Sequence, residues 1–237
     1  MTTLAGKTAF VTGGSRGIGF AVARALLAQG AGVVITGTDQ ERLESAATSL
    51  GADKLLALRC DVRNYGDVQA AMSKAVQRFG GLDILVNNAG VGVFKPVAET
   101  TVEEWHRVLD TNLSGVFYCC HAVIPHLRAR RGGWIINVSS LASKNPFVNG
   151  GAYCASKSAL NAFSETLMQE VRYEGIRVAY VLPGSVNTGF GGLSNTKSEW
   201  ALQPEDVATV VLDLIAHPGH SLPSRVEIRP AQPPRRT

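Results

Sequence analysis

Short apolar runs rich in β-branched residues alternate with helical segments along the 237-residue chain, and this alternation restricts the fold more than any other feature. The runs are Thr8–Thr12, Gly32–Thr36, Leu55–Arg59, Asp83–Asn87, Trp134–Ser139, Ile176–Leu182 and Arg225–Ile228. Strands that alternate with helices form parallel sheets through right-handed crossovers, with helices on both faces. The sequence therefore predicts an α/β fold built on a doubly wound parallel sheet.

The segments between the runs carry helix signals. Thr101 followed by Glu104 is a capping-box pattern, and apolar residues recur every three to four positions from Ala159 to Val171. Because no repeat, low-complexity segment or linker interrupts the pattern, we expect a single domain over residues 1–237. Residues 230–237 hold three prolines and two arginines and are expected to form a loosely held tail.

Composition excludes several classes of protein. With 45% hydrophobic and 18% charged residues, the chain is globular rather than disordered. It has no apolar stretch of about 18 residues and no signal-peptide pattern, which predicts a cytoplasmic protein without a membrane span. The cysteines form no C-x-x-C pair, which indicates reduced thiols rather than disulfides or a metal site. They are Cys60, Cys119, Cys120 and Cys154.

The formal net charge of +4 raises the question of a nucleic-acid partner. The basic residues are scattered, however, and no aromatic residues alternate with them. The densest group, Arg128, Arg130 and Arg131, is expected at a helix C-terminus, where cations suit the helix dipole. We therefore predict no nucleic-acid partner, although the positive excess favours an anionic cofactor.

A glycine-rich turn follows the first strand and opens the first helix. Its sequence is Thr12-Gly13-Gly14-Ser15-Arg16-Gly17-Ile18-Gly19. Glycines permit a tight turn and a close backbone approach to a pyrophosphate, and the helix N-terminus supplies free N–H groups. The spacing departs from the G-x-G-x-x-G fingerprint, and an ordinary glycine-rich loop is the alternative interpretation. The strand–turn–helix context nevertheless favours a dinucleotide cofactor.

The ends of the second and third strands bear on which cofactor this is. NAD-specific sites place an acid after the second strand, whereas here Gly37 has no side chain. Arg16 can reach a 2′-phosphate and Thr38 can donate a hydroxyl to it, which favours NADP(H) over NAD(H). As alternatives, Arg16 is a solvated surface residue, and Asp39 either caps the next helix or turns back toward the ribose. Asp61 can bond an adenine amino group or cap its own following helix.

Residues suited to chemistry follow the fourth and fifth strands, at the sheet edge where ligands bind. The fourth strand ends in Asn87-Asn88-Ala89-Gly90 and the fifth in Ser139-Ser140. Tyr153 and Lys157 stand four residues apart, on one face of a helix, and no other tyrosine has a lysine at that spacing. A surface contact is the alternative for any single Tyr/Lys pair.

This set of residues suits hydride transfer to a carbonyl group. A ketone that accepts hydride needs a proton, and tyrosine can give it, although its unperturbed pKa of about 10 is high. A nearby ammonium and a cationic nicotinamide are expected to lower the pKa of Tyr153, and a serine hydroxyl can hold the substrate oxygen. We therefore predict an oxidoreductase that acts on a carbonyl/alcohol pair.

Together these motifs resemble the short-chain dehydrogenase/reductase family over nearly the whole chain. The resemblance also rests on Asn112 and on Pro183-Gly184-x-Val186-x-Thr188. It implies one doubly wound Rossmann-type domain with a seven-stranded parallel sheet flanked by helices. It further implies a homotetramer, or at least a homodimer, in line with apolar residues on Asn112–Arg130 and Tyr153–Tyr173 that one sheet face is not expected to cover.

By position, the resemblance assigns Tyr153 as general acid/base and Ser140 as catalytic serine. Lys157 would lower the tyrosine pKa and hold the ribose, and Asn112 would hold a water in the proton relay. A polar residue inside a helix is the alternative for Asn112. The implied cofactor contacts are Thr12, Gly13, Ser15, Arg16, Gly17, Ile18, Gly19, Thr38, Asp61, Val62, Asn88, Ala89, Gly90, Tyr153, Lys157, Pro183, Gly184, Val186 and Thr188.

The substrate is less constrained. The pattern is closest to 3-oxoacyl-carrier-protein reductases, but the segment Thr188–Pro204 is short for a substrate-covering loop. The ending Val226–Pro230 is more similar to members that act on small hydroxy acids or diverse carbonyls. The expected pocket is mostly apolar, and its residues are Val93, Phe94, Leu141, Phe147, Phe190 and Leu193. The alternative function is a non-catalytic NADP(H)-sensing protein, although such proteins typically lack the tyrosine or the lysine.

Overall fold

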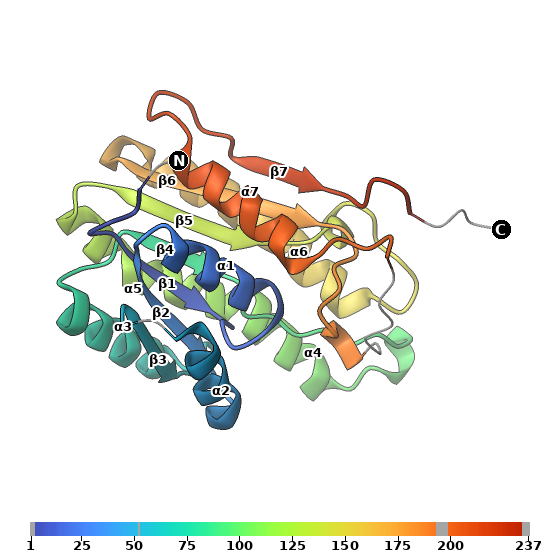
Figure 1. The fold of residues 1–237 in the computed structure, drawn as a ribbon. Coiled ribbons are helices and arrows are strands. Elements are labelled where there is room, and N and C mark those ends of the chain that lie inside the picture. Colours follow the sequence, from blue (N-terminus) through green and yellow to red (C-terminus); the bar gives the residue numbers. More distant parts are fainter. Residues whose placement is uncertain (1–2, 52, 193–198, 234–237) are drawn as a thin grey trace.

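A seven-stranded parallel sheet forms the centre of the molecule (Figure 1). The structure is a computed structural model that describes residues 3–51, 53–192 and 199–233. The strands are β1 (Thr8–Thr12), β2 (Gly32–Gly37), β3 (Leu55–Arg59), β4 (Ile84–Asn87), β5 (Gly133–Val138), β6 (Ile176–Pro183) and β7 (Arg225–Ile228). They pair in the order β3-β2-β1-β4-β5-β6-β7. The predicted α/β doubly wound fold is confirmed, and the expected strand ends agree to within one residue.

Helices connect successive strands. The longer ones are α1 (Gly17–Ala28), α2 (Gln40–Leu50), α3 (Tyr65–Phe79), α4 (Val102–Leu109), α5 (Gly115–Ala129), α6 (Gly151–Val171) and α7 (Pro204–Ala216). Short turns are η1 (Val97–Glu99), the π-helical η2 (Asp110–Ser114), η3 (Leu141–Ser143), η4 (Arg172–Glu174) and η5 (Phe190–Gly192). The predicted capping box opens α4, where Thr101 and Glu104 each accept a hydrogen bond from the other's backbone N–H.

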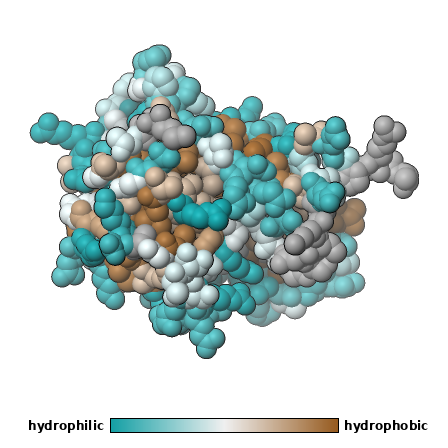
Figure 2. Space-filling view, viewed as in Figure 1, coloured by the Kyte–Doolittle hydropathy of each residue, from teal (hydrophilic) through white to brown (hydrophobic). Residues whose placement is uncertain are grey.

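Two apolar cores lie on opposite faces of the sheet, because successive strand residues point to opposite sides. On β1, Ala9 and Val11 join one core, together with residues of α1, α2 and α7. Phe10 points the other way and joins α3, α5 and α6 in the second core. On the face shown in Figure 2, hydrophilic side chains cover most of the periphery and apolar ones gather toward the middle. This layering leaves the carboxyl ends of the strands, and the loops that follow them, open for a ligand.

Ion pairs form around Asp83 at the amino ends of the strands. Buried Asp83 accepts hydrogen bonds from Lys7 Nζ at 3.0 Å and from Arg130 Nη2 at 3.2 Å. Arg130 is the C-cap of α5, so the predicted place of the arginine group at a helix C-terminus is confirmed. Arg128, in the last turn, pairs with Glu174.

Further predictions concern membrane spans, metal sites, the cysteines and the C-terminal tail. Within the described ranges, no helix is both long and apolar enough to cross a bilayer, and no three His, Cys, Asp or Glu side chains gather as metal ligands. The four cysteines are free and buried. Leu193 and residues 234–237 lie outside the described residues, so the structure bears only on the beginning of the expected tail.

Candidate active site

A cleft of about 1010 Å³, here called the strand-end cleft, lies at the carboxyl ends of the strands. Most of the predicted site residues line it, namely Gly13, Ser15, Arg16, Gly17, Ile18, Thr38, Asp61, Val62, Asn88, Ala89, Gly90, Ser140, Tyr153, Lys157, Pro183, Gly184, Val186 and Thr188. Three others, Thr12, Gly19 and Asn112, lie behind this lining. The fold therefore brings the glycine-rich turn, the strand ends and the Tyr/Lys pair together around one cleft.

Thr12 and Gly19 hold the glycine-rich turn against the loop after β4. The Thr12 hydroxyl accepts hydrogen bonds from the backbone N–H groups of Asn88 and Ala89, both at 3.0 Å. The Asn88 side chain donates to the carbonyls of Thr12 and Gly13, also at 3.0 Å. A Cβ on Gly19 would lie only 2.3 Å from the Gly13 carbonyl oxygen. Thr12 and Gly19 thus support the turn without being among the residues that line the cleft, and their expected contacts with a cofactor stay a prediction.

We expect Gly19→Ala to lower the free energy of unfolding by about 1–3 kcal/mol, the usual cost of overpacking. The added methyl group must push the turn away from α1, so the dissociation constant for NADPH should rise as well. Urea unfolding and fluorescence titration with NADPH measure the two effects. Gly219→Ala is the matched control, because a Cβ there meets nothing within 4 Å. A Gly19→Ala protein that unfolds and binds NADPH like the parent would contradict this account.

The glycine-rich turn itself fits the diphosphate of a dinucleotide. Gly13 and Gly17 have φ values of 63° and 56°, which glycine adopts without strain. A Cβ on Gly13 would lie 2.9 Å from Ala89 Cα, so only glycine allows this close approach. Arg16, the N-cap of α1, makes no side-chain capping bond to any described residue, and the cap and first turn of this helix line the cleft. An open helix N-terminus of this kind attracts anions.

The ribose-phosphate end of the cleft contains more arginine than the sequence analysis anticipated. Asp39 caps α2, since its carboxylate accepts from Arg42 N at 3.1 Å and pairs with Arg42 Nε at 3.0 Å. The helix-cap interpretation of Asp39 is therefore confirmed. Arg42 lines the cleft beside Arg16 and Thr38, and Arg59 Nε donates to the Thr38 carbonyl at 3.3 Å. Neither Arg42 nor Arg59 belongs to a motif in the sequence. Arg59 meets Thr38 because the end of β3 lies beside the end of β2.

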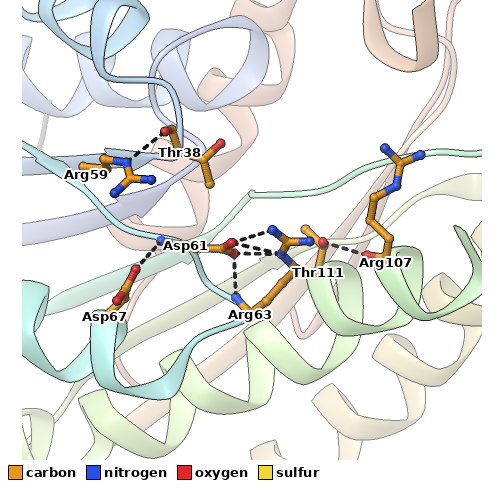
Figure 3. A network of polar contacts seen from close by, with 7 residues as sticks. All are labelled: Thr38, Arg59, Asp61, Arg63, Asp67, Arg107 and Thr111. Carbon is orange, nitrogen blue, oxygen red and sulfur yellow. Dashed lines mark hydrogen bonds and ion pairs between the residues drawn. The ribbon is translucent and has the colours of Figure 1, made fainter. Parts of the chain in front are cut away.

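Asp61 is held by Arg63 rather than by a helix (Figure 3). Both of its carboxylate oxygens accept from the Arg63 guanidinium, at 2.6–3.0 Å, and one also accepts from Arg63 N. These hydrogen bonds lower the pKa of Asp61. The next helix, α3, is capped by Asn64, so the capping interpretation of Asp61 is wrong. The carboxylate remains at the wall of the cleft as an acceptor.

Tyr153 and Lys157 project from the first turns of α6 into the cleft. Lys157 Nζ donates to the Val138 carbonyl at 2.8 Å and lies 5.9 Å from the centroid of the Tyr153 ring. Burial lowers the pKa of Lys157 to about 8. Burial also raises the pKa of Tyr153, and the neighbouring Ser140 hydroxyl opposes this rise. In the protein alone, burial of the ring therefore outweighs the neighbouring groups. The lowering of the Tyr153 pKa by the ammonium together with a cationic nicotinamide stays a prediction.

A hydrogen-bond network missed by the sequence analysis fixes the turn that carries Ser140. Ser139 Oγ donates to Asn161 Oδ1 at 2.6 Å, and Asn161 Nδ2 donates to Ser143 Oγ at 2.8 Å. Ser143 Oγ in turn donates to the Ser140 carbonyl at 2.6 Å. Asn161 lies one helical turn after Lys157, and that spacing is the only signal in the sequence. The network ties the serine turn to the helix that carries Tyr153.

Asn112 is fully buried in the π-helical turn η2. Its side chain accepts from Val91 N at 2.8 Å and donates to Val91 O at 2.9 Å and Ser156 Oγ at 3.0 Å. It thereby fixes the loop after Gly90 to α6. Single π-helical turns occur frequently at functional sites, and this one lies directly behind the cleft lining.

Comparisons with known proteins agree with this geometry. The family description "short chain dehydrogenase" matches residues 7–199. An uncharacterised oxidoreductase of Staphylococcus aureus (strain USA300) is 33% identical over 97% of this chain and 100% of its own length. Among solved structures, a metagenomic short-chain oxidoreductase in complex with NADP is 36% identical, covers 98% of this chain and 100% of that one, and has a TM-score of 0.86.

A 3-ketoacyl-(acyl-carrier-protein) reductase from Brucella melitensis, complexed with NADH, is 29% identical. The match covers 95% of this chain and 98% of the Brucella chain, with a TM-score of 0.89. The family match covers most of the chain, and the sheet order and the strand-end cleft are those expected from the sequence motifs. The chain therefore belongs to the short-chain dehydrogenase/reductase family of NAD(P)-dependent oxidoreductases.

Proposed function

We propose that this protein is a cytoplasmic NADP(H)-dependent enzyme that interconverts a ketone or aldehyde with its alcohol. The observation that carries the proposal is the placement of Ser140, Tyr153 and Lys157 together in the lining of the strand-end cleft, with Tyr153 and Lys157 on the same helix. Ser140 and Tyr153 bind the substrate oxygen. When bound, NADPH supplies the hydride.

The protonation state of Tyr153 determines its role in the proposed reaction. A phenol with the ordinary pKa of about 10 is protonated at neutral pH, and burial raises the pKa of Tyr153 further, so Tyr153 is a proton donor for carbonyl reduction. Ser140 donates a hydrogen bond to the oxygen that gains negative charge. Lys157 is anchored by the Val138 carbonyl, and its remaining N–H donors would hold the ribose hydroxyls. Asn112 keeps the adjacent loop in register, and the water-holding role that the family resemblance implies for it is part of the proposal.

Three features support NADP(H) rather than NAD(H). Gly37 offers no carboxylate, Arg16 and Arg42 line the phosphate end, and Asp39 is neutralised by Arg42. A carboxylate that caps a helix and pairs with an arginine is a poor acceptor for a ribose hydroxyl. NAD(H) is the secondary cofactor of this proposal.

The proposed activity is tested by following NADPH oxidation at 340 nm with a panel of ketones, aldehydes and 3-oxoacyl thioesters. Turnover with any panel member supports the enzyme. NADPH binding without oxidation of any member would favour the alternative, a non-catalytic NADP(H)-sensing protein. The tyrosine, serine and lysine of the cleft argue against that alternative, because a sensor needs none of them.

We also propose a homotetramer or homodimer that associates through α5 and α6. Phe117 of α5 is 47% exposed although it packs on Tyr118 and on Phe163 of α6. Tyr65 and His121 extend this aromatic surface. Large apolar surfaces of this kind are usually covered by a partner.

Light scattering at micromolar concentration should therefore give a mass of at least two chains. Phe117→Glu should shift the mass toward one chain, because it places a charge in the contact. Val102→Glu is the control, since Val102 is 66% exposed on the separate helix α4. A single-chain mass for the unmodified protein would overturn this assembly.

A further inference from the structure

Aromatic rings surround the proposed proton donor. The Phe94 ring meets Tyr153 edge-on at a centroid distance of 5.5 Å, and the Phe190 ring lies 5.5 Å from Tyr153 on another side. Phe147 extends the group, 5.9 Å from Phe94. All four rings line the strand-end cleft. We call Phe94, Phe147 and Phe190 the aromatic wall.

Glycines fix the position of this wall. A Cβ on Gly92 would lie 2.6 Å from Phe94 Cζ, and one on Gly191 would lie 2.4 Å from Phe94 Cε2. Backbone therefore packs directly on the Phe94 ring from two different loops. Gly150 is placed in the same way, with its Cβ position 2.8 Å from Phe147 Cε2. Rings held by backbone in this manner are preformed, so a ligand that stacks on them loses little conformational entropy.

Two cationic side chains on this side of the protein, Arg229 and Lys144, are already paired with a carboxylate. Arg229 lines the cleft but pairs with Glu227 at 2.8 Å, and Lys144 also bonds Glu227. Arg107 lines the cleft from α4, where its carbonyl accepts a hydrogen bond from the Thr111 hydroxyl (Figure 3). A substrate carboxylate at the wall would lose its water and would compete with Glu227 for Arg229 and Lys144, and such burial is costly.

We propose that the substrates are neutral ketones or aldehydes with a flat apolar substituent about the size of a phenyl ring, which packs on the aromatic wall while the carbonyl faces Ser140 and Tyr153. This inference rests on the proposed carbonyl reductase activity and names its substrate class. An aromatic group also attracts ammonium ions, so a cationic substituent is the competing outcome.

Three ketones separate these outcomes. Phenylacetone, acetoacetate and trimethylammonioacetone share the CH3COCH2 group and differ in a neutral, anionic or cationic end. We expect kcat/KM for phenylacetone to exceed that for each of the others by about 10-fold or more, the size expected for burying a phenyl group. A preference for acetoacetate or for the ammonium ketone would overturn the inference.

The wall itself is tested by Phe147→Ala, because Phe147 is the member that touches Phe94 rather than Tyr153 in the ring contacts. The ratio of kcat/KM for phenylacetone to that for acetone should fall by about 5-fold or more, since the smaller ketone does not reach this ring. The matched control is Val148→Ala, whose side chain is 87% exposed next to Phe147. An unchanged ratio in Phe147→Ala would contradict the proposed contact.

Binding without turnover separates this inference from the proposed activity. Calorimetry on the Tyr153→Phe protein saturated with NADPH measures the dissociation constants of the same three ketones. Tighter binding of phenylacetone supports the substrate class even where no ketone is reduced by the unmodified protein, a result that would refute only the activity. Equal or weaker binding of phenylacetone overturns the substrate class, whatever the activity.

Discussion

Tyr153→Phe is expected to lower kcat by at least about 10²-fold, the low end for loss of a general acid/base. In the proposed mechanism the phenol, which lines the cleft, is the proton donor. A phenol is protonated at neutral pH, and burial raises the pKa of Tyr153 further. Phenylalanine retains the ring and its edge-on contact with Phe94, so the fold and NADPH binding should persist. Steady-state kinetics, NADPH titration and thermal unfolding of the same preparation measure the three quantities.

The control for this substitution is Tyr173→Phe, which removes a hydroxyl from a side chain that is 86% exposed. That protein should retain the turnover of the parent. Near-normal turnover in Tyr153→Phe would remove tyrosine from the mechanism. Loss of NADPH binding together with turnover would show instead that the hydroxyl is structural.

The features that sequence could predict are those with a local physical cause. Strand ends agreed to within one residue because each strand is a short apolar run bounded by glycine or polar residues. The Thr101 capping box formed because its two partners are three residues apart. Tyr153 and Lys157 share a helix face for the same reason, since a spacing of four is fixed by helix geometry.

Features that depend on which of several partners a side chain meets were not predictable. The carboxylate of Asp61 had two plausible partners, and the structure gives it a third, Arg63, through a turn of two residues. Arg59 meets the Thr38 carbonyl only because β3 lies beside β2. The pKa of Tyr153 depends on burial, which a Tyr/Lys spacing does not reveal.

The second large expected effect is a change in the preference between NADPH and NADH. Gly37 lies where an acid would bind the ribose, and a Cβ there would meet its nearest neighbours, Ser15 and Leu43, at 3.5–3.6 Å. That is ordinary contact, and Gly37 has no positive φ, so a larger residue fits without the backbone strain that a glycine turn can impose. Gly37→Asp should therefore fold normally and shift preference toward NADH, because its carboxylate repels a 2′-phosphate and accepts from a 2′-hydroxyl.

Arg16→Ala should act from the other direction and remove most of the preference of the parent for NADPH. A charge-assisted hydrogen bond contributes about 1.5–3 kcal/mol, which corresponds to roughly 10- to 150-fold in binding at about 1.4 kcal/mol per factor of ten. The dissociation constant for NADPH should rise by that factor while that for NADH changes little, since only NADPH carries the 2′-phosphate. Arg24→Ala is the matched control, because Arg24 lies on the same helix but pairs with Glu205 on α7. Titration of each protein with both reduced cofactors gives the result: tighter binding of NADH than NADPH by the unmodified protein would mean that Asp39, turned toward the ribose, rather than Arg16 sets the cofactor choice.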